Sequence, residues 1–114
     1  MRAEEVAFVG ALVHRFPVLL PILQVHLDDY ETLLPHVFLA DVTRWLVGKS
    51  GSRSDSDVNA VLLFLEACFS EGEEEERELI SASFLENVPD PGEAGSELRG
   101  RLGPALAQGL DQIG

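Results

Sequence analysis

Apolar residues recur at three- and four-residue spacing along almost the whole of this 114-residue chain. This spacing places apolar side chains on one face of an α-helix, whereas a half-buried strand needs strict alternation, which no stretch keeps for long. A chain of this length is normally one domain with its own hydrophobic core. The sequence therefore predicts an all-α fold: a single-domain bundle of five or six helices over residues 1–114, or a short α-solenoid-like stack of helix pairs.

Six segments carry the helical pattern, and prolines, glycines and capping residues mark their ends. Thr32 is the predicted N-cap of the third helix. Ser54, followed by Asp57, resembles a capping box for the fourth. A small, polar loop over residues 49–54 separates these two helices. The predicted helices cover residues 4–15, 18–30, 32–47, 55–70, 73–88 and 96–113.

Two of these helices are apolar on more than one side, which is typical of helices enclosed by neighbours. The helix over 55–70 is apolar almost all round and is predicted to be the centre of the bundle. The helix over 18–30 has a main apolar face and a second stripe nearly opposite, so it is predicted to lie between neighbouring helices. The main face consists of Leu20, Leu23, Leu27 and Tyr30, and the second stripe of Val18, Ile22 and Val25.

The last predicted helix is the weakest. Residues 96–113 keep four leucines on one face but contain Gly100, Gly103, Pro104 and Gly109, each of which weakens a helix. We expect residues 90–114, which contain this helix, to be the most mobile part of the chain.

The chain is strongly acidic, with a net charge of −12. Residues 1–57 carry five Lys or Arg and eight Asp or Glu, whereas residues 58–114 carry three and twelve. Phosphate binding needs clustered Lys and Arg, so the composition argues against nucleic acid as a direct ligand. A basic protein partner is compatible with this charge.

The densest acidic run, residues 71–78, lies at the predicted start of the fifth helix, where the helix dipole favours carboxylates. The dipole accounts for the first turn only. We expect Glu78 and Glu86 to join Glu75 on one outward face that binds a basic protein, with Asp28 and Asp29 as a second patch. The predicted partner-binding residues are Glu71, Glu75, Glu78, Glu86, Asp28 and Asp29.

Histidines and carboxylates in residues 26–41 are the candidates for catalysis. No spacing typical of a metal site in a helical bundle is present, so no metal or other cofactor is predicted. His36 and Asp41 diverge by about 140° on a helix and form no catalytic pair alone. Asp41 is predicted to pair with Arg44, and His36 to form a surface or interhelical hydrogen bond. An enzyme remains an alternative only if folding brings His26, His36 and Asp41 together.

Features that would place the chain in a membrane or an oxidising compartment are missing from the sequence. Pro17, Pro21 and charged residues break the longest apolar stretches, which argues against a membrane span. The single cysteine, Cys68, cannot form an internal disulfide and is predicted to be an inert, buried thiol. We therefore expect a cytoplasmic protein.

Two blocks of sequence resemble a known family. One is His26-Leu-Asp-Asp-Tyr-Glu-Thr-Leu-Leu-Pro-His36 with the following segment to Trp45, and the other is Glu78-Leu-Ile-Ser-Ala-Ser-Phe-Leu-Glu-Asn-Val88. They resemble a family of short, stand-alone, all-helical bacterial proteins of unassigned function, which implies a fold and no activity. Small acidic helical proteins of this kind are similar in character to bacterial immunity proteins, which neutralise a basic toxin.

Together these patterns favour a non-catalytic, acidic protein-binding module, immunity- or antitoxin-like, that occludes a basic partner. One alternative is the enzyme described above. The other is a helical scaffold or homo-oligomer that uses exposed apolar stripes, either Val18, Ile22 and Val25 or Leu63, Phe64 and Ala67.

Overall fold

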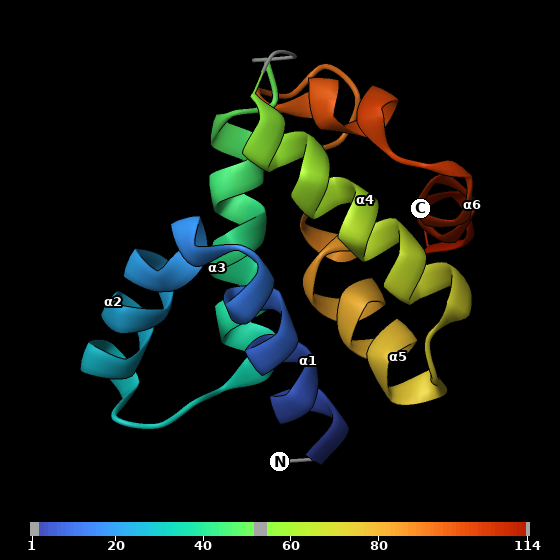
Figure 1. The fold of residues 1–114 in the computed structure, drawn as a ribbon. Coiled ribbons are helices and arrows are strands. Elements are labelled where there is room, and N and C mark those ends of the chain that lie inside the picture. The colour runs from blue at the N-terminus through green and yellow to red at the C-terminus, as the bar shows by residue number, and fades with distance from the viewer. Residues whose placement is uncertain (1–2, 52–54, 114) are drawn as a thin grey trace.

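The computed structural model describes residues 3–51 and 55–113 (Figure 1). Over these residues the chain forms six α-helices, three 3-10 helices and no strand, so the predicted all-α bundle is confirmed. The elements are α1 (Ala3–Arg15), η1 (Pro17–Leu19), α2 (Leu20–Tyr30), α3 (Pro35–Gly48), α4 (Ser56–Glu71), α5 (Glu74–Ser83), η2 (Leu85–Asn87), η3 (Ser96–Arg101) and α6 (Pro104–Ile113).

The overall dimensions decide between the two predicted architectures. The Cα radius of gyration is 13.3 Å and the principal extents are 36 × 27 × 22 Å. A compact domain of this length is expected to have a radius of gyration of about 13 Å. The helices therefore form one compact bundle and not an extended stack of helix pairs.

The centre of the bundle is formed by α3 and α5, and the prediction that α4 is central is wrong. α3 packs against α1, α2 and α5, while α5 also packs against α1 and α4. α4 packs mainly against α5 and α6, and Phe64 also contacts the rings of Phe8 and Phe16, but Leu63 is 71% exposed, so α4 is not enclosed by neighbours. On the inward side of α4 the buried residues follow the three- and four-residue apolar spacing of the sequence: Val58, Val61, Leu62, Leu65 and Phe69.

The start of α3 differs from the prediction, because Thr32 is not its N-cap. α2 ends at Tyr30, and the C-cap residue Glu31 adopts a left-handed conformation with φ of 61°. α3 then begins at Pro35, whose ring is tolerated in a first turn, and extended Leu34 precedes it without a side-chain cap. The four-residue spacing from Leu34 to Phe38 indicated that Leu34 also faces inward, but its side chain is exposed.

At the start of α4, Asp55 provides the N-cap. Its Oδ1 accepts hydrogen bonds from the backbone N–H groups of Asp57 and Val58, at 3.0 and 3.1 Å. These bonds lower the pKa of the Asp55 carboxyl group, with the bond from Val58 as the largest cause and Lys49 as a further one. The predicted cap, Ser54, lies outside the described residues.

The C-terminal segment is not one helix. η3 ends before Leu102, and α6 begins at Pro104 in a position where proline suits the first turn. The Glu66 side chain of α4 caps α6: its two carboxylate oxygens accept hydrogen bonds from the N–H groups of Ala105 and Leu106, at 2.9 and 3.0 Å. A methyl group at Gly103 would lie 2.5 Å from Glu66 Cδ, so a larger residue there would displace the Glu66 side chain from its capping position. Of the predicted leucine stripe, Leu98, Leu106 and Leu110 are buried.

No single helix within the described residues is long and apolar enough to cross a membrane. α1 with the segment Pro17–Tyr30 reaches the necessary length and composition, but the chain bends by 110° between these two parts.

Candidate protein-binding site

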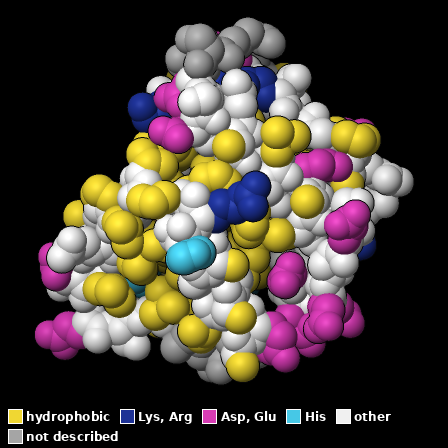
Figure 2. Space-filling model, viewed as in Figure 1, with side chains coloured by type: hydrophobic (Ala, Val, Ile, Leu, Met, Phe, Trp, Pro, Cys, Tyr) yellow, Lys and Arg dark blue, Asp and Glu magenta, His cyan; other side chains and the backbone are white. Residues whose placement is uncertain are grey.

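Exposed apolar side chains concentrate on and around α2. Among the described residues, most of the exposed large hydrophobic side chains belong to the segment from residue 18 to residue 34. Figure 2 shows a broad hydrophobic area over the part of the face where Figure 1 places α2. A concentration of exposed apolar side chains on one helix is typical of a binding surface. The exposed members are Val18, Leu20, Val25, Leu27, Tyr30 and Leu34.

This exposure overturns the prediction that α2 lies between two neighbours. α2 packs against α3 and η1, so one side only is covered. Three of the four residues of the predicted inner face, Leu20, Leu27 and Tyr30, are exposed, while Leu23 is half-buried. The buried residue is His26, which the prediction treated as a polar candidate for catalysis.

His26 fixes α2 against the rest of the fold. Its side chain is 1% exposed and its ring lies 5.0 Å from the ring of Tyr30 and 6.0 Å from that of Phe38, centroid to centroid. The Leu34 N–H donates a hydrogen bond of 3.0 Å to His26 Nε2. Since Nε2 is the acceptor, a ring proton lies on Nδ1, which has no hydrogen-bond partner among the described residues. His26 therefore connects α2 to the segment before α3.

Replacement of His26 by phenylalanine is expected to lower the free energy of unfolding by about 1–3 kcal/mol. The ring packing would be kept, but the Leu34 N–H would lose its acceptor. Chemical denaturation measures the loss. His14 is exposed on α1, so His14→Phe is the matched control and is expected to change stability by less than about 0.5 kcal/mol. Equal stability of the two variants would contradict this role of His26.

Two open grooves flank α2. The first has a volume of about 360 Å³ and is formed by α2 alone, from Leu20, Leu23, Gln24, Leu27 and Asp28. The second has a volume of about 510 Å³ and lies between α2 and α3. Its lining from α2 is mainly apolar, and α3 contributes one ion pair. The residues of this second groove are Pro21, Ile22, Val25, Asp29, Tyr30, Asp41 and Arg44.

The second predicted acidic patch coincides with this apolar surface. Asp28 lines the first groove and Asp29 lines the second, and both side chains are exposed. The whole segment from residue 16 to residue 43 contains four carboxylates and no Lys or Arg. Asp28 and Asp29 therefore form an acidic rim around exposed apolar side chains, the arrangement found in protein interfaces.

The first predicted acidic patch is arranged differently from the prediction. α5 ends at Ser83, and Glu86 lies in η2 beyond it, so Glu75, Glu78 and Glu86 do not share one helical face. Glu75 is half-buried, whereas Glu71 and Glu78 are exposed. Figure 2 shows acidic side chains gathered where Figure 1 places the start of α5. Carboxylates in this first turn are what the helix dipole favours.

The three residues of the enzyme alternative have separate partners. His26 bonds to Leu34, as described above, and Asp41 forms the predicted ion pair with Arg44. His36 forms an interhelical hydrogen bond as predicted, from Nδ1 to Ser83 Oγ at 2.8 Å, and its Nε2 lies 3.0 Å from a carboxylate oxygen of Glu5. No group of three His, Cys, Asp or Glu side chains that could hold a metal occurs within residues 3–51 and 55–113.

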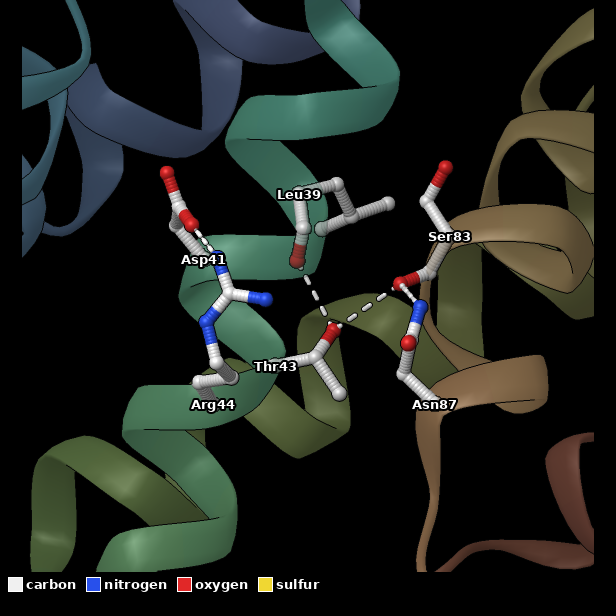
Figure 3. Close-up of polar contacts among 6 residues, drawn as sticks. All are labelled: Leu39, Asp41, Thr43, Arg44, Ser83 and Asn87. Atoms are coloured by element: carbon white, nitrogen blue, oxygen red, sulfur yellow. Dashed lines mark hydrogen bonds and ion pairs between the residues drawn. The ribbon is translucent and has the colours of Figure 1, made fainter. Parts of the chain in front are cut away.

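A buried polar network between α3 and the end of α5 was not predicted. The Thr43 hydroxyl donates to the backbone carbonyl of Leu39 at 2.8 Å and lies 3.2 Å from that of Ser83. The Asn87 amide also donates to the Ser83 carbonyl, at 2.9 Å (Figure 3). Thr43 and Ser83 are buried. Two of these side chains, Thr43 and Asn87, therefore satisfy the carbonyl of Ser83, the last residue of α5, which has no partner within the helix.

Cys68 is half-buried on α4, and its burial, together with the charge of Glu76, raises the pKa of the thiol to about 11. At pH 8 about one Cys68 in a thousand is then a thiolate, which is the reactive form. We expect alkylation by iodoacetamide to be slow at pH 8 and to accelerate about tenfold per pH unit up to pH 10. Unfolding in denaturant should restore the ordinary thiol pKa and fast alkylation near pH 9. A plateau at pH 9 in the folded protein would contradict this.

The fold and the surface around α2 define a compact all-helical domain with an exposed, acid-rimmed apolar area. The chain belongs to the family described as a domain of unknown function (DUF7674), whose profile matches residues 9–113. Comparison with curated proteins and with solved structures gives no significant match.

Proposed function

We propose that this protein is a non-catalytic binding module for a basic protein, and that the surface around α2 is where the partner docks. The observation that supports this most directly is the position of exposed Leu20, Val25 and Leu27 beside the carboxylates of Asp28 and Asp29. Stable interfaces combine a few apolar anchors at the centre with a polar rim. The rim around α2 selects a partner with Lys or Arg at its edge.

The two acidic patches have different roles in this proposal. Asp28 and Asp29 border apolar anchors, so they act at the docking surface. The carboxylates at the start of α5 contribute to the net charge of −12, which attracts a basic partner over a distance and speeds association. The most specific form of this proposal is that the protein covers the functional surface of its partner, as an immunity protein or an antitoxin does.

The test is capture of partners from native lysate at low and high salt with three baits. They are the wild-type chain, a variant with Asp28→Asn and Asp29→Asn, and a control with Glu71→Gln and Glu74→Gln, which removes the same amount of charge at α5. We expect a basic protein to be captured by the wild type and the control and lost with the first variant or at high salt. Capture of the same protein by all three baits at both salt concentrations, or of none, would overturn the proposal.

A second candidate function is self-association, favoured by the exposure of Val18 and Val25 from one predicted stripe and of Leu63 from the other. In that case the surface around α2 pairs with a second copy, and the protein is a scaffold. Sedimentation equilibrium at increasing concentration distinguishes the two functions. A monomer mass throughout is expected for the binding module, and a dimer mass that Val25→Ser abolishes is expected for the scaffold.

A further inference from the structure

We propose that the groove between α2 and α3 binds one amphipathic helix of the partner, with a Lys or Arg of that helix placed beside Asp29. This inference rests on the proposed function, because it specifies the part of the basic partner that docks and the side of α2 that receives it.

The shape of the groove favours a helix over an extended segment. Its two walls are helices, whose interior backbone groups are already paired, and no strand edge is present within the described residues. An extended segment would leave its own backbone N–H and C=O groups unpaired against apolar side chains, which is costly. A helix pairs its backbone internally and presents apolar side chains at i, i+3, i+4 and i+7.

The groove has apolar side chains at different depths. Ile22 is half-buried and lies deeper, while Val25 is 60% exposed and Tyr30 is also exposed. α2 has 11 residues and is therefore about 16 Å long. That length matches about three turns of a partner helix, enough for three apolar anchors.

The charges of the groove place a cation of the partner at one end. Asp29 lies in the last turn of α2, where the helix dipole adds partial negative charge. The one cation in the lining, Arg44, is paired with Asp41, so the charge of Arg44 is offset within the groove. The lining thus has two carboxylates for one cation, and Asp29 provides the net negative charge that a Lys or Arg of the partner helix would meet.

The groove on the other side of α2 is the less suitable receptor. Its lining residues, Leu20, Leu23, Gln24, Leu27 and Asp28, all belong to α2, so a helix docked there would have one wall only. The two grooves nevertheless offer matched pairs of residues, Val25 with Leu27 and Asp29 with Asp28, which differ in the side of α2 on which they lie.

The first experiment uses these pairs in the full chain, with the captured partner and a measured dissociation constant. We expect Val25→Ser and Asp29→Asn each to raise the dissociation constant about tenfold, and Leu27→Ser and Asp28→Asn to change it less than about threefold. The reverse order, or equal effects in both pairs, would overturn the groove assignment and leave the proposed function standing. No effect in any of the four variants would overturn both.

The second experiment identifies what lies in the groove. The photo-crosslinking amino acid p-benzoylphenylalanine is placed at position 25 in one protein and at position 27 in another, and the linked peptides are sequenced by mass spectrometry. We expect position 25 to link to a partner segment with helical apolar spacing and at least one Lys or Arg. A proline-rich or acidic segment, or linkage from position 27 alone, would overturn the inference. Linkage to a second copy of this chain would overturn it together with the proposed function.

Discussion

Replacement of Phe38 by alanine is expected to lower the free energy of unfolding by about 3–5 kcal/mol, the largest single effect that we derive. Phe38 is fully buried on α3, one of the two central helices, and its ring packs edge-on against His26. Its removal would leave a cavity in the core and also weaken the support of α2. A small domain has about 5–15 kcal/mol of stability in total, so the loss is a large part of it.

Urea denaturation measures this effect, and Leu63→Ala is the control. Leu63 is apolar but 71% exposed, so its truncation is expected to change stability by less than about 0.5 kcal/mol. A loss below about 1 kcal/mol for Phe38→Ala would contradict its position in the core.

Replacement of Glu66 by alanine is expected to cost about 2–3 kcal/mol, because two N–H groups at the start of α6 would lose a charged acceptor. We expect the effect on stability to be accompanied by local opening at the start of α6. We therefore expect the amide hydrogens of Ala105 and Leu106 to exchange faster with solvent, with little change in α1 or α2. Hydrogen exchange followed by NMR measures both.

Glu66→Gln is the matched control, because its amide oxygen can accept from one of the two N–H groups but not from both. Its destabilisation is expected to lie between those of the wild type and the alanine variant. Faster exchange spread evenly over the whole chain would mean that Glu66 supports the fold in general and does not act as the cap of α6.

The hydrophobic core was the part of the fold that the sequence predicted best. Leu65 on α4, and Ile80, Phe84 and Val88 on and after α5, are buried as their spacing indicated. Periodicity succeeds there because three- and four-residue spacing identifies side chains that share a helix face, and in these segments that face packs into the core.

The same reasoning failed for α2, whose spacing is apolar on two sides. Periodicity shows that side chains share a face but not whether another helix covers that face. The prediction therefore placed Leu27 inside and left His26 as a polar residue, while the structure has His26 buried and Leu27 exposed. This failure is informative, because exposed apolar side chains at positions that look like core are typical of a docking surface.

Contacts between residues distant in sequence had no local signal. Glu66 caps a helix that begins nearly forty residues later, and Thr43 approaches the Ser83 carbonyl across a similar separation. The break before α6 did have a signal, because Gly103 and Pro104 mark a helix start as readily as a weak helix interior. The second acidic patch was predicted from Asp28 and Asp29, but its apolar surroundings became visible only in the folded chain.

The central claim is that the surface around α2 is the docking surface for a basic partner. Hydrogen–deuterium exchange of the free and partner-bound protein tests it most directly. The account predicts that residues 20–30 and the facing turns of α3 exchange more slowly in the complex, while residues 71–78 are unchanged. Slower exchange confined to residues 71–78, with α2 unaffected, would contradict it.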